Sequence, residues 1–225
     1  MSAVTRKRVA VLISGRGSNM AALIKAAQNE SYPAEVELVL SNRRDAAGLH
    51  EARATGIAAA LVDHKEYGSD RQAFEQALQA RLEAHKIDIV CLAGFMRLLT
   101  PWFVERWRGR MLNIHPSLLP AFKGLHTHER ALAAGVKLHG ATVHFVVPDM
   151  DSGPIIAQAA VAVRDDDSAE RLAARVLAVE HRIYPLALRL LATERIRCAD
   201  GRCMIDGVVA NDATLIVPDD EGKAR

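Results

Sequence analysis

"RVAVLISGRGSNMAALIKAAQN", residues 8–29, indicates the fold class of this 225-residue chain. It begins with a short apolar run, which is typical of a strand covered on both faces. Two glycines then allow a tight turn, and the apolar residues after them recur at the three- and four-residue spacing of a helix. The segment therefore predicts a strand, a turn and a helix in direct succession.

The same alternation continues through the first half of the chain. Apolar runs rich in β-forming residues lie at 34–41, 58–63 and 87–94, with helical patterns between them at 46–56 and 71–86. Strands that alternate with helices of this length form βαβ units. We therefore expect an α/β fold, a Rossmann-like and mostly parallel twisted sheet flanked by helices on both faces.

The second half continues with strands and one long helix. Strands are expected at 110–115, 138–147 and 154–163, and an amphipathic helix at 168–192. Pro185 lies inside that helix and is expected to kink it. We predict a single domain over residues 1–195, followed by a small hairpin and a frayed end over 196–225.

Composition excludes several classes of protein. Half of the residues are hydrophobic and a quarter are charged, as in globular proteins, and the net charge of +2 gives no electrostatic case for a nucleic-acid partner. No apolar run approaches the roughly 20 residues that span a bilayer. The three cysteines, Cys91, Cys198 and Cys203, are too few for a disulfide framework, so we expect a cytoplasmic protein and treat the 198–203 pair as structural.

Three turn-like segments follow three separate strands. They are 14–19 ("SGRGSN"), 93–99 ("AGFMRLL") and 115–120 ("HPSLLP"). In open parallel sheets, ligands bind beyond the carboxyl ends of the strands. The three segments are therefore expected to meet at one edge of the sheet and to form the site.

The 14–19 turn fits a single phosphate. Gly17 lets the backbone turn its N–H groups inward, Ser18 and Asn19 are suitable helix caps, and Arg16 is placed to add a charged contact. The dinucleotide fingerprint fails because its third glycine falls at Met20, and the P-loop motif is absent. An ordinary glycine turn into a helix remains the alternative.

Asn113 and His115 lie two residues apart at the end of an apolar run, so they project from the same strand face. Buried as a pair, they would leave polar atoms in need of partners. If they face a cleft instead, both side chains can donate hydrogen bonds to a bound ligand. Asp149 and Asp151 follow in a later turn, either as turn formers or as a carboxylate that holds His115.

Two further segments leave alternatives open. Residues 93–103 combine several large apolar side chains with a single arginine, Arg97. This composition indicates either an ordinary packed loop or an apolar slot for a flat heterocycle. Five of the nine histidines fall between residues 115 and 144, yet no recognised metal-ligand spacing occurs there. We expect structural or surface histidines and no metal.

Six segments together are similar to one family. These are "VLISGRGSNM" (11–20), "LAGFMRLL" (92–99), "LNIHPSLLPAFKGLHTH" (112–128), "HGATVHFV" (139–146), "DMDSGPII" (149–156) and "EHRIYP" (180–185). Their order and spacing resemble those of the folate-dependent formyltransferases over about residues 8–190. The Gly-x-Gly-Ser-Asn loop resembles the members that act on glycinamide ribonucleotide in purine biosynthesis.

The resemblance implies a transferase with 10-formyltetrahydrofolate as co-substrate, small-molecule partners only, no membrane and a monomeric or homodimeric state. It implies a nucleotide-binding N-terminal half and a folate-binding, catalytic C-terminal half. By this resemblance the catalytic trio is Asn113, His115 and Asp151, and the substrate contacts are Gly17, Ser18, Asn19 and Glu180, with Arg16 added by inference from its place in the loop. The implied folate contacts are Arg71, Met96, Arg97, Leu98, Leu99, Asn113, Val147 and Asp151.

Three rival functions are weighed against this reading. Methionyl-tRNA formyltransferase carries a further C-terminal domain, and formyltetrahydrofolate hydrolase carries an N-terminal regulatory domain, so both are disfavoured. A non-catalytic phosphate-binding protein on the same kind of sheet is the third, because fold does not fix function. The complete trio of Asn113, His115 and Asp151 argues against it.

Overall fold

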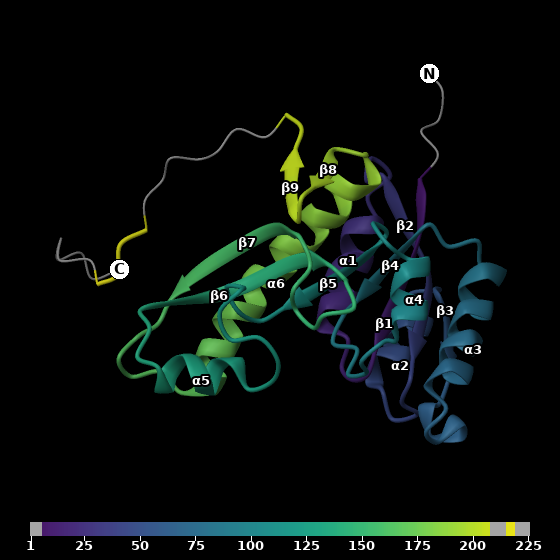
Figure 1. Cartoon of the computed structure of the whole chain (residues 1–225), viewed down its shortest axis with the longest axis horizontal. Coiled ribbons are helices and arrows are strands. Elements are labelled where there is room, and N and C mark those ends of the chain that lie inside the picture. Colours follow the sequence, from purple (N-terminus) through teal and green to yellow (C-terminus); the bar gives the residue numbers. More distant parts are fainter. Residues whose placement is uncertain (1–5, 208–214, 219–225) are drawn as a thin grey trace.

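A computed structural model of the chain describes residues 6–207 and 215–218, and Figure 1 shows a central twisted sheet with helices packed on it. The sheet has seven strands in the order β3-β2-β1-β4-β5-β6-β7. Five strands are parallel: β1 (Lys7–Ile13), β2 (Ala34–Ser41), β3 (Ala58–Leu61), β4 (Ile89–Leu92) and β5 (Met111–His115). β6 (Leu138–Phe145) pairs antiparallel with β5 on one side and with β7 (Ile155–Ala162) on the other, so β7 again runs in the direction of the first five strands.

Helices cover both faces of this sheet, as the sequence predicts. One face carries α1 (Ser18–Ala27), α2 (Ala47–Ala54), α5 (Thr127–Ala133) and α6 (Ala169–Ala192). The other carries the 3₁₀-helix η1 (His64–Tyr67), α3 (Arg71–Ala84) and α4 (Pro101–Arg106). Each face therefore has its own hydrophobic core, which explains why the central strands are apolar along their whole length.

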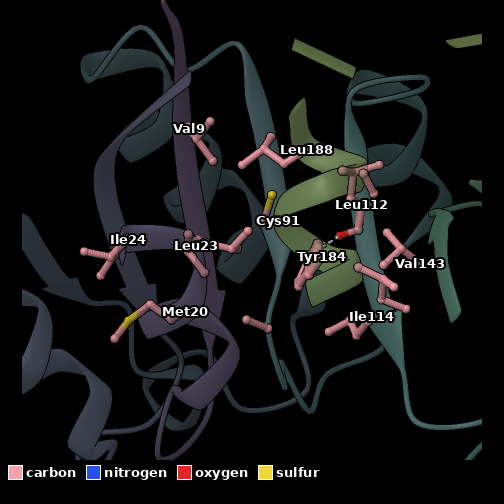
Figure 2. Packing of buried hydrophobic residues seen from close by; sticks show 14 of the residues in the cluster. Val9, Met20, Leu23, Ile24, Cys91, Leu112, Ile114, Val143, Tyr184 and Leu188 are labelled. Atoms are coloured by element: carbon pink, nitrogen blue, oxygen red, sulfur yellow. Dashed lines mark hydrogen bonds between the residues drawn. The ribbon is translucent and has the colours of Figure 1, made fainter. Parts of the chain in front are cut away.

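Alternation along β1 divides its side chains between the two cores. Val9 and Val11 belong to the core under α1 and α6, whereas Ala10 and Leu12 belong to the core under α3 and α4. Figure 2 shows the first core, in which Tyr184 of α6 lies beside the sheet. Its buried hydroxyl donates to two strand carbonyls, those of Leu92 and Leu112, at 2.9 and 3.2 Å. The longest helix is thus fixed to β4 and β5.

Three short helices were missed by the sequence analysis. The sequence leaves residues 93–103 open as a packed loop or an apolar slot, but α4 occupies the end of this segment, and α5 and η1 lie in stretches for which no helix is predicted. These helices have six, seven and four residues, too few for an apolar period to stand out. α6 runs through Pro185 as one continuous helix.

The predicted hairpin after the last helix is present. It consists of β8 (Ile196–Ala199) and β9 (Arg202–Ile205), whose directly opposed cysteines, Cys198 and Cys203, form a disulfide. Ile205 on this hairpin packs against the core under α6. The predicted frayed end lies largely outside the described residues. None of the described helices is both long and apolar enough to cross a membrane.

Candidate active site

The loops after β1 and β4 lie together at one edge of the sheet, because the two strands are parallel neighbours. The backbone N–H of Ser14 donates to the carbonyl of Gly94 at 3.1 Å, and the N–H of Met96 donates to the Ser14 hydroxyl at 2.7 Å. The loop after β5 follows at the same edge. The structure therefore brings together the three turn segments that the sequence places at the site.

The loop after β1 turns into α1 at a glycine in the left-handed backbone conformation. Gly17 has φ 81° and immediately precedes α1, and a Cβ there would lie 3.2 Å from the Cα of Gly48. The prediction that Ser18 or Asn19 caps the helix with its side chain is wrong, because α1 starts without a side-chain cap. The amide of Asn19 is used elsewhere, so no cap competes for the first N–H groups of the helix.

Asn19 and Glu180 form a buried link between α1 and α6. The Asn19 amide donates to a carboxylate oxygen of Glu180 at 2.7 Å, and Glu180 is only 6% exposed. Burial raises the pKa of the Glu180 carboxyl, and the hydrogen bond from Asn19 opposes that shift. A carboxyl group predicted to contact substrate is thus held next to the phosphate-type loop. Arg16 lies exposed on the same loop.

The three predicted catalytic side chains come together around β5. Asn113 and His115 share one face of this strand, and Asp151 enters from the turn after β6 with a left-handed φ of 51°. A carboxylate oxygen of Asp151 lies 3.5 Å from Nδ1 of His115 and accepts a hydrogen bond from the N–H of Gly124 at 2.9 Å. The carboxylate of Asp151 therefore faces the Nδ1 side of the imidazole ring, and the hydrogen bond from the Gly124 N–H holds it in place.

Both ring nitrogens of His115 face acceptors. Nδ1 faces the Asp151 carboxylate, and Nε2 lies 3.0 Å from the carbonyl oxygen of Phe122. A carbonyl and a carboxylate accept but cannot donate, so the imidazolium, which donates from both nitrogens, satisfies this arrangement. The environment of His115 thus suits a charged ring that is oriented by Asp151.

His144 is a member of this cluster that the sequence analysis did not assign to it. In the antiparallel pairing of β5 with β6, His144 lies directly opposite Asn113, and its Nε2 is 3.2 Å from the Asn113 amide nitrogen and 3.8 Å from Asp151. Its Nδ1 faces the carbonyl of Phe145 at 2.8 Å. Burial lowers the pKa of His144, so the neutral ring donates through Nδ1 and accepts from Asn113 through Nε2. This bond fixes the direction of the Asn113 amide.

The segment predicted to form an apolar slot exposes two large apolar side chains on the loop after β4. Met96 and Leu98 are 66% and 65% exposed, unusual values for large apolar side chains, whereas Leu99 is partly buried against the core under α3. The Arg71 guanidinium donates to the Leu98 carbonyl and holds this loop to α3. Arg97 lies 5.9 Å from the ring of Phe74.

The remaining predicted residues have plainer surroundings. Val147 is half-buried at the end of β6, and Asp149 is exposed in the turn. Within the histidine-rich stretch, His128 and His139 pack together with ring nitrogens 3.2 Å apart, and burial lowers the pKa of His139 to about 4. Across residues 6–207 and 215–218 no group of three potential ligands is arranged to hold a metal ion.

Residues 7–188 match the family described as formyl transferase. The chain belongs to the formyl transferase family. Among curated relatives, phosphoribosylglycinamide formyltransferase of Escherichia coli is 44% identical over 199 residues, which cover 88% of this chain and 93% of the relative. A trifunctional purine biosynthetic protein of Bos taurus is 50% identical over 195 residues, 87% of this chain. This formyl transferase spans about a fifth (19%) of that longer protein.

Solved structures of the same family share the fold. The crystal structure of phosphoribosylglycinamide formyltransferase from Brucella melitensis is 56% identical and superposes with a TM-score of 0.80. The match covers 84% of this chain and 96% of that one. The Rossmann-like, mostly parallel sheet expected from the sequence is therefore the fold that this formyl transferase shares with its relatives.

Proposed function

We propose that this formyl transferase moves the formyl group of 10-formyltetrahydrofolate to the amine of 5'-phosphoribosylglycinamide, giving phosphoribosyl-N-formylglycinamide and tetrahydrofolate in purine biosynthesis. The observation that carries the proposal is the placement of Asn113 and His115 side by side on β5 with Asp151 behind the ring. The names of the relatives from Escherichia coli and Brucella melitensis point to the same reaction.

In the proposed reaction the amine attacks the formyl carbon directly. Its lone pair forms the new C–N bond, and the formyl oxygen takes up negative charge in a tetrahedral intermediate. Asn113 and His115 would donate hydrogen bonds to that oxygen, where preorganised donors contribute most. Collapse breaks the bond to N10 of the folate, and the proton lost by the amine passes to N10, with Asp151 or a water as carrier.

One contact must change for this chemistry to proceed. Nε2 of His115 is bonded to the Phe122 carbonyl, so the formyl oxygen has to replace that carbonyl. We expect the segment that carries Phe122 to move aside when folate binds. Asp151 would keep the ring oriented throughout, because it contacts the other nitrogen.

The two substrates are assigned to the two halves of the site. The phosphate of glycinamide ribonucleotide would bind the N–H groups at Gly17, Ser18 and Asn19, because a helix N-terminus favours an anion. The ribose or glycinamide end of the same molecule would contact Glu180. The folate ring would enter the apolar slot at 96–99, beside Arg71 and Val147. Holding both reactants next to β5 would supply much of the rate.

The test is formyl transfer measured by tetrahydrofolate production, with and without glycinamide ribonucleotide. Acceptor-dependent turnover is expected, and turnover without acceptor would indicate a hydrolase instead. His115→Ala is expected to abolish transfer while the ribonucleotide still binds, because the phosphate loop is on a different strand. Activity retained within a few-fold in that variant would exclude His115 from the mechanism.

A further inference from the structure

A groove of about 910 Å³ runs between α1 and α6. Both helices cover the same face of the sheet. Residues of α1 at helical spacing line one wall, from Ser18 through Lys25 towards Asn29. Residues of α6 at the same spacing, His181, Pro185 and Arg189, line the other. At 1.5 Å per residue, the wall from position 18 to position 29 is about 16 Å long.

The lining of this groove contains basic side chains and no acidic ones. Lys25, His181 and Arg189 line it, and no carboxylate does. Neither Lys25 nor Arg189 forms an ion pair with any of the residues that the structure describes. Two cations on opposite walls without counter-charges create a local positive potential, although the net charge of the whole chain is only +2.

Arg189 is held against the groove by the packing beneath it. Its guanidinium carbon lies 5.4 Å from the centre of the Tyr32 ring, a cation–π distance. Tyr32 is itself buried and fixed, because its hydroxyl donates to the carbonyl of Pro185 at 2.7 Å. Arg189 therefore loses less side-chain freedom on binding an anion than a freely solvated arginine would.

His181 leaves a polar atom without a partner beside the groove. Its Nε2 is buried and makes no hydrogen bond to any described residue, which is unusual for a buried nitrogen. The ring lies one residue after Glu180 but faces the groove, whereas Glu180 faces Asn19. The groove thus carries the charges of Lys25 and Arg189, and the His181 ring keeps its Nε2 buried without a partner among the described residues.

We propose that this groove is a second anion-binding site, which takes a small molecule carrying at least two phosphate or carboxylate groups. Lys25 and Arg189 lie on different helices, so a ligand with two anionic groups can pair with each of them separately. A small molecule fits better than a protein segment, since the volume lies within the range of about 300–1,000 Å³ for small-ligand sites. The site is distinct from the trio on β5 and touches the phosphate loop only through Ser18.

The experiment is calorimetric titration of the full chain with inorganic pyrophosphate and, separately, with citrate. Glycinamide ribonucleotide at saturating concentration occupies the phosphate loop during both titrations. Lys25→Gln and Arg189→Gln are compared with Lys65→Gln, an exposed lysine on η1 at the opposite face. Each groove substitution is expected to weaken binding by about tenfold, the usual effect of losing one charged hydrogen bond, and the control to leave it unchanged.

Lys25→Arg serves as the second variant, because it keeps the charge and should keep the affinity. Binding of pyrophosphate alone identifies an organic phosphate as the natural class, and binding of citrate alone identifies a polycarboxylate. The proposal is overturned if neither anion binds, if binding ignores both groove substitutions, or if a glutamate-rich peptide binds where the small anions do not. Since binding is measured directly, these results stand whether or not formyl transfer is observed.

Discussion

Replacing Asp151 by asparagine tests the electrostatic part of the mechanism most directly. The substitution keeps the shape of the side chain and an oxygen that can still accept from the N–H of Gly124, but it removes the negative charge 3.5 Å from His115. Two unit charges at that distance interact by about 5 kcal/mol at an effective dielectric constant of 20. The amide dipole recovers part of this energy, so we expect kcat to fall by roughly 10²–10³, as when one oxyanion-stabilising group is lost.

The assay is steady-state formyl transfer, with KM determined for both substrates and thermal melting as a check on folding. The KM for glycinamide ribonucleotide should stay within a few-fold, because the loop proposed to bind its phosphate, at Gly17 and Asn19, follows a different strand. Asp149→Asn, an exposed aspartate in the same turn, is the matched control and should behave as the unmodified enzyme. The reasoning fails if Asp151→Asn retains kcat within a few-fold, or if its whole defect appears in the ribonucleotide KM.

Three further predictions concern stability and covalent structure. Burial raises the pKa of the Glu180 carboxyl in the folded protein above its ordinary value of 4.5, so the protein loses stability as pH rises from 4.5 through the folded pKa. Glu180→Gln cannot ionise, so in urea unfolding it should gain stability relative to the unmodified protein as pH rises above 4.5, while the KM for glycinamide ribonucleotide rises. Gly140→Ala places a Cβ 1.9 Å from the Ala159 carbonyl and should lower the free energy of unfolding by about 3 kcal/mol or more, whereas Gly15→Ala, with open space around it, should have little effect. Thiol titration of the unfolded, unreduced chain should find one free cysteine and three after reduction, and reduction should lower stability by about 2 kcal/mol, as expected for opening so small a loop.

Much of the fold could be predicted because the strands differ sharply from their surroundings. The apolar runs of β1, β2 and β4 are bounded by turns, and each of α1, α3 and α6 repeats its apolar residues over at least two turns. The helices that were missed, α4 and α5, are shorter than two full turns and bury few side chains. Local sequence carries too little periodic signal at that length.

His144 shows why the site could be only partly predicted. The spacing of Asn113 and His115 on one strand is visible in the sequence, since both lie within three residues. The contact between Asn113 and His144 depends on the antiparallel register of β5 with β6, which aligns residues 31 positions apart. That register is set by the whole strand pair and by the turn that carries Asp151, so no short motif reveals it.

The order of the strands explains why one edge of the sheet holds every group that the proposed reaction needs. The chain runs outward from β1 to β2 and β3, then returns to place β4 on the other side of β1. Connections leave in opposite directions at such a point, and a crevice opens between the loops that follow the two strands. The loop proposed to bind phosphate follows β1 and the segment proposed to bind folate follows β4, so the strand order places the two proposed ligand sites on neighbouring loops at one edge of the sheet. β5 adds Asn113 and His115 next to β4. β6 runs antiparallel to β5, with Thr142 beside His115 and Phe145 beside Leu112, and the turn between β6 and β7 brings Asp151 to 3.5 Å from Nδ1 of His115.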